Sequence, residues 1–193
     1  MKNLFPFVAT LLFAFSANSQ TKDYATLKVK VTNLQVDSLV IISYKKPNFK
    51  KIIKVNKDGL LKDTLNVKGD KYYVSNCSNL FPNGIYLSNG YDLKISIDAK
   101  DPGQTLVFSG KGAAENEFAT TFAKNEENFD YESLLQLNES EFNKEIDKIR
   151  LNLFATLDKK KYASDFVAYQ TSYLDYFIEM KTQAYKEIIE GKK

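Results

Sequence analysis

Hydrophobic and polar residues alternate along much of the first half of the chain. Within Ala25–Thr32, hydrophobic residues such as Leu27 and Val29 are separated by lysines, and a period of two residues is typical of a strand with one buried face. Short runs of this kind continue, with Asn-Gly and Asp-Gly turn sequences between them and no helical pattern among them. The pattern predicts an antiparallel β-sandwich of about seven strands over Tyr24–Ser109.

In the second half of the chain, hydrophobic residues recur at steps of three and four, which is the spacing of an amphipathic helix. The pattern predicts a helix over Ala114–Asn125, a second that begins at Asn138–Glu141, and a last one from about Tyr162 to Ile189. The fold class that we expect is therefore α+β. The expected parts are a signal segment at 1–19, a β-sandwich domain at 20–110 and a region of about three helices at 111–193.

The first residues predict export. Lys2 precedes an apolar run over Leu4–Phe15, and the small residues Ala17 and Ser19 follow at the positions that usually precede signal-peptide cleavage. The apolar run is too short to span a bilayer as a permanent helix. We therefore expect cleavage near Ser19-Gln20, a periplasmic or outer-surface location, and no integral membrane span.

Composition narrows the possible chemistry. The 193 residues include no histidine, so the commonest general base and transition-metal ligand is missing. The formal net charge of +3 is too small to indicate a nucleic-acid partner, which would need a concentrated basic face. Acidic pairs such as Glu126-Glu127 lie in polar helical stretches, where contact with solvent explains them more simply than glycosidase chemistry. We expect no catalytic residue, no metal ion and no cofactor.

Cys77 is the single cysteine of the chain, so neither an internal disulfide nor a Cys-x-x-Cys pair can exist. Its neighbours in the sequence are neutral, and a reactive thiol would need a nearby cation, histidine or helix N-terminus. We therefore expect a small, partly buried hydrophobic residue, with an intermolecular disulfide as the alternative.

Three tyrosines near the C-terminus are the candidate partner-binding residues. Tyr169, Tyr173 and Tyr176 lie on one stripe of the last expected helix. An aromatic stripe at helical spacing is more often part of a core. The alternative is a face that binds a protein partner.

Two motifs near the middle of the chain resemble those of a known family. Gly90–Leu93 reads Gly-Tyr-Asp-Leu, and Phe108–Asn116 reads Phe-Ser-Gly-Lys-Gly-Ala-Ala-Glu-Asn. Their order is similar to that in the N-terminal region of TlpA/ResA-type thiol–disulfide oxidoreductases exported by Bacteroidetes. In that family, redox chemistry belongs to a following thioredoxin domain with a Cys-x-x-Cys pair. This chain contains no such pair, so no catalytic residue of the family is transferred to it.

The resemblance implies a non-catalytic periplasmic accessory or binding domain that docks a protein partner, such as a thioredoxin-like domain. A truncated or split thiol–disulfide oxidoreductase, whose catalytic domain is missing, is one alternative, and a carbohydrate- or peptide-binding sandwich is another. Exported proteins of Bacteroidetes are also O-glycosylated at Asp-Ser/Thr-apolar triplets. By this resemblance, Ser38 and Thr64 are candidate glycosylation sites.

Overall fold

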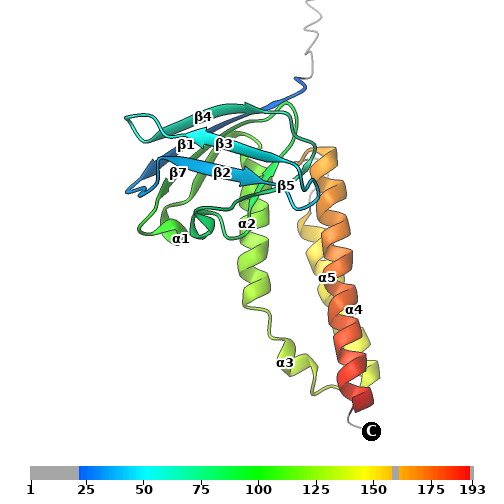
Figure 1. Cartoon of the computed structure of the whole chain (residues 1–193). Coiled ribbons are helices and arrows are strands. Elements are labelled where there is room, and N and C mark those ends of the chain that lie inside the picture. The colour runs from blue at the N-terminus through cyan, green and yellow to red at the C-terminus, as the bar shows by residue number, and fades with distance from the viewer. Residues whose placement is uncertain (1–21, 158–160, 192–193) are drawn as a thin grey trace, which may run out of the picture.

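A computed structural model describes residues 22–157 and 161–191 of the chain (Figure 1). The expected signal segment at 1–19 and its cleavage site lie outside the described residues. None of the described helices combines the length and the apolar composition that a bilayer crossing requires.

Eight strands form two four-stranded sheets, and we call the two sheets together the two-sheet body. The order of strands is β4-β1-β7-β8 in the first sheet and β3-β2-β5-β6 in the second. The first sheet consists of β1 (Ala25–Thr32), β4 (Leu60–Leu65), β7 (Asp92–Asp98) and β8 (Val107–Lys111). The second sheet consists of β2 (Ser38–Ile42), β3 (Lys50–Lys54), β5 (Asp70–Val74) and β6 (Ile85–Leu87).

The first sheet contains one parallel pair. Strand β1 lies between β4 and β7, antiparallel to β4 and parallel to β7, with Leu27 opposite Leu93 and Val29 opposite Ile95. The pairs of the second sheet are all antiparallel. The expectation of antiparallel pairing throughout is therefore wrong at β1 and β7. Alternation reports which face of a strand is buried, and it does not report which strand lies beside it.

The inward-facing residues of both sheets belong to one hydrophobic cluster, which we call the main core. Leu27 and Val29 of the first sheet and Leu39 and Ile41 of the second are at most 2% exposed. The helices contribute to the same cluster, and Phe166 and Leu174 of the last helix are both 0% exposed. Burial of this continuous apolar surface is the main force that holds the sheets to each other and to the helices.

Five α-helices and one 3-10 turn complete the described chain. They are η1 (Ser78–Leu80), α1 (Pro102–Thr105), α2 (Ala113–Glu127), α3 (Tyr131–Leu134), α4 (Glu139–Thr156) and α5 (Ser164–Gly191). Figure 1 shows that α2, α4 and α5 extend from the same side of the two-sheet body, and that α4 and α5 run in opposite directions beside each other. Helix α4 begins with a capping box. The Asn138 side chain accepts a hydrogen bond from the backbone N–H of Glu141, and the Glu141 side chain accepts one from the backbone N–H of Asn138.

Away from the body, α3, α4 and α5 share a second and smaller cluster, which we call the distal cluster. It consists of Leu134, Phe142, Ile146, Phe177, Ile178 and Tyr185. At its centre the rings of Phe142 and Tyr185 stack with centroids 3.8 Å apart. The far ends of α4 and α5 are therefore held by contacts among helices.

The expected counts of about seven strands and three helices differ from the structure, since the described residues form eight strands and five helices. The three long helices α2, α4 and α5 are the ones that periodicity predicts. The additional helices α1 and α3 are single turns of four residues, which are too short to carry a hydrophobic period. Strand β8 continues to Lys111, one position beyond the expected end of the first domain.

Candidate functional site

A cleft of about 260 Å³ opens where the two-sheet body meets α2. Its walls are the loop Asn79–Gly84, the single turn α1 and one face of α2. Among the residues that line it, Leu80, Phe81 and Phe108 are only 1%, 3% and 8% exposed and belong to the main core. A group that entered the cleft would therefore meet an apolar floor with polar residues at the rim, which is the usual composition of a binding pocket.

The loop wall of the cleft depends on Gly84. This residue has a φ of +71°, and a Cβ atom added to it would lie 3.0 Å from both the Tyr72 carbonyl oxygen and the Tyr73 ring. The Gly84 N–H donates a hydrogen bond to the Phe81 carbonyl at 2.9 Å, which closes the turn. Glycine is required here because other residues rarely adopt this backbone conformation and a side chain would strike its neighbours.

The helical wall carries both signs of charge. Glu117, Thr121 and Lys124 follow one another on α2 at steps of four and three residues, so they face the cleft together. All three are exposed. Over the described ranges, no group of three or more His, Cys, Asp or Glu side chains is arranged to hold a metal ion. The wall can offer a carboxylate and an ammonium group to the polar parts of a ligand.

Asn116 fixes the position of α2, and hence of this wall. Its side-chain oxygen accepts from the Tyr86 N–H at 2.9 Å, and its amide nitrogen donates to the carbonyls of Tyr86 at 2.9 Å and Gly112 at 2.8 Å. Asn116 is 2% exposed, so these bonds satisfy polar groups that water cannot reach. Gly112, with a φ of +102°, turns the chain from β8 into α2, and a Cβ atom there would lie 2.3 Å from the Tyr91 ring.

The start of α5 is tied to the same place. Glu115, which is 7% exposed, accepts a hydrogen bond from the Ala163 N–H at 3.1 Å, and the Ser88 hydroxyl donates to the Asp165 carboxylate. We call the residues Tyr86, Ser88, Tyr91, Glu115, Asn116 and Asp165 the junction. The motif Phe108–Asn116, on which the family resemblance rests, therefore supplies the part of the junction that orients α2.

The junction also holds two neutral phenols. The hydroxyls of Tyr86 and Tyr91 are buried without a hydrogen-bond partner among the described residues. Burial raises the pKa of both side chains far above the ordinary value of 10, and the carboxylates of Asp165 and Glu115 raise it further. Neither phenol ionises near neutral pH, so neither can act as a base there.

Comparisons with protein-family models, with curated proteins and with solved structures gave no match. No family is therefore assigned to the chain. The resemblance to exported thioredoxin-like proteins stays a prediction, and the site must be interpreted from its own geometry.

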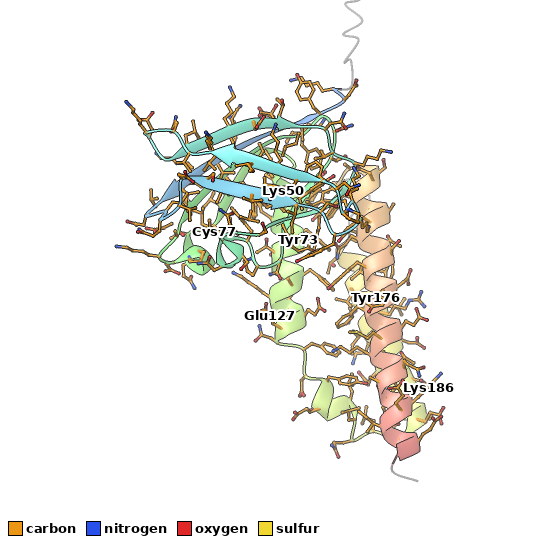
Figure 2. The ribbon with its side chains drawn as sticks, in the orientation of Figure 1. Lys50, Tyr73, Cys77, Glu127, Tyr176 and Lys186 are labelled. Carbon is orange, nitrogen blue, oxygen red and sulfur yellow. The ribbon has the colours of Figure 1, made fainter. Side chains whose placement is uncertain are left out.

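The structure separates the three candidate tyrosines. The Tyr169 ring lies 5.3 Å from that of Tyr86, and the Tyr173 hydroxyl donates to Glu126 of α2 at 2.8 Å, so both residues contribute to the attachment of α5. Tyr176 is 61% exposed, and Figure 2 shows it on the stretch of α5 that has passed the two-sheet body. Helical spacing places the three tyrosines on one side of α5, but the body covers only the first two.

The remaining candidate residues are not part of the cleft lining. Cys77 is half-buried and packs against the main core. Ser38 is half-buried at the start of β2, where its hydroxyl donates to Asp37 at 2.9 Å, and Thr64 is exposed on β4. The glycosylation of Ser38 and Thr64 stays a prediction.

The hydrophobic pattern of the sequence does not predict the cleft. Its walls come from a loop, a single helical turn and the exposed face of α2, none of which has a hydrophobic period. The proline-glycine turns at Pro82–Gly84 and Pro102-Gly103 are the signals in the sequence that could have pointed to it.

Proposed function

We propose that the protein is a non-catalytic, exported binding module, built as a β-sandwich with a helical arm, whose cleft holds a short peptide segment of a protein partner. The observation that supports this proposal is the cleft itself, with an apolar floor of Leu80, Phe81 and Phe108 beside the charged side chains of Glu117 and Lys124. An accessory role of the kind found before thioredoxin domains agrees with the motif that builds the junction.

The chemistry of the cleft favours a peptide over a sugar. An apolar side chain can occupy the floor while the polar groups of its own backbone face Glu117 and Lys124. Most carbons of a sugar ring carry a hydroxyl, and each hydroxyl loses its partners when it is buried against Leu80 or Phe108. A volume of about 260 Å³ suits one side chain with its adjacent peptide groups, since pockets for whole drug-sized molecules are usually larger.

The lining also supports a role without catalysis. A nucleophilic mechanism needs a hydroxyl or thiol within hydrogen-bond reach of a base. The cleft contains the hydroxyls of Thr120 and Thr121, but no described hydrogen bond joins either of them to a carboxylate. Cys77, the one thiol of the chain, is not part of the lining.

Selection from a display library of short random peptides tests the proposal. We expect the purified protein to enrich peptides in which charged residues flank a hydrophobic residue. The variant Thr121→Trp, which fills the cleft, should weaken binding of the selected peptides by about tenfold or more. The matched control is Asn125→Trp, at an exposed position of α2 outside the lining, and it should leave binding unchanged.

Two results would contradict the proposal. The first is equal binding of the selected peptides by the protein and by Thr121→Trp. The second is catalytic reduction of insulin disulfides by the purified protein, with activity lost in Cys77→Ser, because that result would assign the protein to the thiol–disulfide oxidoreductases.

A further inference from the structure

The outward face of the first sheet is rich in lysine. The inward positions of its strands are buried in the main core, so the alternate positions point away from it. These alternate positions include five lysines, which we call the lysine face: Lys28 and Lys30 of β1, Lys62 of β4, Lys94 of β7 and Lys111 of β8. Four of them are exposed, and Lys28 is partly covered.

Strand register places three of these lysines in a row. Lys62 and Lys94 lie directly opposite Lys28 on its two sides, and neighbouring strands are about 4.8 Å apart. Like charges at directly opposite positions of a sheet destabilise it. Asp92 offsets part of this repulsion, since it pairs with the Lys28 ammonium at 3.1 Å. The row is therefore a feature that folding alone does not favour.

The lysine row borders a shallow hollow of about 280 Å³. Lys28, Lys30 and Lys94 line it together with two serines, Ser96 and Ser109, and with the apolar residues Leu60, Ile95 and Val107. The lysine and serine side chains can donate hydrogen bonds to the oxygen atoms of an anion, while most of the surface that lines the hollow is apolar.

The second sheet carries lysine in a different arrangement. Lys50 and Lys54 of β3 and Lys71 of β5 are at its outward positions, and Figure 2 shows Lys50 and Tyr73 on this sheet. None of these lysines lies opposite another lysine, and Ile52, which is 54% exposed, separates Lys50 from Lys54. Lysines at directly opposite positions are therefore found on the first sheet alone among the described strands, although Asp92 and Asp98 are also at its outward positions.

The form of the lysine face indicates which kind of anion it fits. It is the surface of a sheet and carries no aromatic side chain at its outward strand positions, whereas proteins that bind single-stranded nucleic acids stack the bases on aromatic rings. Its cations are all lysines, which act as hydrated point charges and do not impose the planar, two-pronged geometry of arginine. Many similar anionic groups arranged in a plane would satisfy such a face.

We propose that the lysine face docks on the anionic headgroups of a lipid bilayer. Each lysine held close to such a surface strengthens binding about fivefold, and the attraction decreases as salt screens it. Docking leaves the cleft open, because Val107 and Ser109 of β8 point outward with the lysines while Phe108 between them lines the cleft. This proposal therefore does not depend on the peptide ligand.

Sedimentation with lipid vesicles tests the proposal. We expect the purified protein to bind vesicles of phosphatidylcholine mixed with phosphatidylglycerol, to release them as salt increases, and not to bind pure phosphatidylcholine. The variant Lys30→Gln/Lys62→Gln/Lys94→Gln should bind about a hundredfold more weakly. It should remain folded, because it removes like charges from opposite positions, and its thermal unfolding checks this.

The matched control removes three exposed lysines that lie outside the lysine face. Lys50→Gln/Lys54→Gln/Lys57→Gln changes the net charge equally, at β3 and the turn that follows it, and it should bind the mixed vesicles within about twofold of the unaltered protein. An equal loss in both variants would overturn the proposal, as would the absence of binding to the mixed vesicles. Tighter binding to a single-stranded oligonucleotide or to free inorganic phosphate than to these vesicles would also overturn it.

Discussion

The main core and the distal cluster are stabilised in different ways. The main core joins both sheets with α2 and the first part of α5, and the hydrogen bonds of the junction close its edge. The distal cluster has six buried residues, all from helices, and no sheet covers it. The comparison suggests that stability is shared across the body and the near half of the arm, while the far half opens on its own.

Phe166 provides the strongest test of the shared stability. It is fully buried, and its ring lies edge-on to those of Tyr86 and Phe118 at 4.9 and 5.9 Å. Phe166→Ala should lower the free energy of unfolding by about 4 kcal/mol, measured by urea denaturation. The sheets and helices should unfold in one transition at a lower urea concentration. Separate transitions for α5 and the body would contradict the shared core.

Asn116→Ala should have the next largest effect. The change leaves the backbone N–H and carbonyl of Tyr86 without partners in a site that is closed to water, at a cost of about 3 kcal/mol. Asn125→Ala, at an exposed position of the same helix, should change the urea midpoint hardly at all. If both substitutions had the same effect, α2 would not depend on the junction.

Phe142→Ala is the counterpart of Phe166→Ala in the distal cluster. Both substitutions remove a phenylalanine ring from a residue that is 0% exposed. We expect a loss of about 2 kcal/mol or less in the global free energy of unfolding. Protection from hydrogen exchange should fall in α4 and in the second half of α5, and it should persist in the sheets. A uniform loss of protection would show that the arm and the body unfold together.

The sequence predicts the local elements of the fold well. Alternation predicts β1 with the bounds that the structure has, and helical spacing predicts α2, α4 and α5. The polar run Asn138–Glu141 also predicts the start of α4 correctly. These features are local, and each depends only on the order of neighbouring residues.

Features that depend on pairing were not predictable in this way. The row of Lys62, Lys28 and Lys94 exists because β1 lies between β4 and β7, whereas the net charge indicated no concentrated basic face. Tyr176 is exposed while Tyr169 is covered, because the two-sheet body ends between their positions along α5. Helical periodicity carries no information about where the body ends. The cleft depends on Gly84 and on single turns of helix, so it carries no repeating pattern.

Asn138→Ala should have a smaller effect. The change removes the capping box of α4, in which Asn138 and Glu141 exchange hydrogen bonds. We expect the far half of the arm to lose about 1 kcal/mol, with faster hydrogen exchange in the first turn of α4. Asn138→Ser, which keeps a capping oxygen, should restore most of the protection. Unchanged exchange in the alanine variant would contradict a role for the cap.

High pH should lower the stability of the region around the junction, whereas a change of pH near neutrality should not. Burial raises the pKa of Tyr86, Tyr91, Tyr169 and Tyr173. Above about pH 10 the unfolded chain loses these protons while the folded chain keeps them. The folded state then binds more protons, so the free energy of unfolding decreases as pH increases. Urea denaturation at about pH 8 and about pH 11 measures the change, and equal midpoints would contradict it.

The parallel pairing of β1 with β7 has a consequence for biosynthesis. As the polypeptide emerges from the ribosome, β2 and β3 can pair soon after they appear, but β1 must wait for Leu93 and its neighbours, which are encoded much later. Until then the edge of β1 that β7 covers in the folded protein is open to pairing with other nascent chains, whereas β4 can cover the other edge earlier. The chain between β1 and β7 forms a long loop, and the closing of a long loop is slow. We therefore expect completion of the first sheet to limit the rate of folding, with the accompanying risk of aggregation.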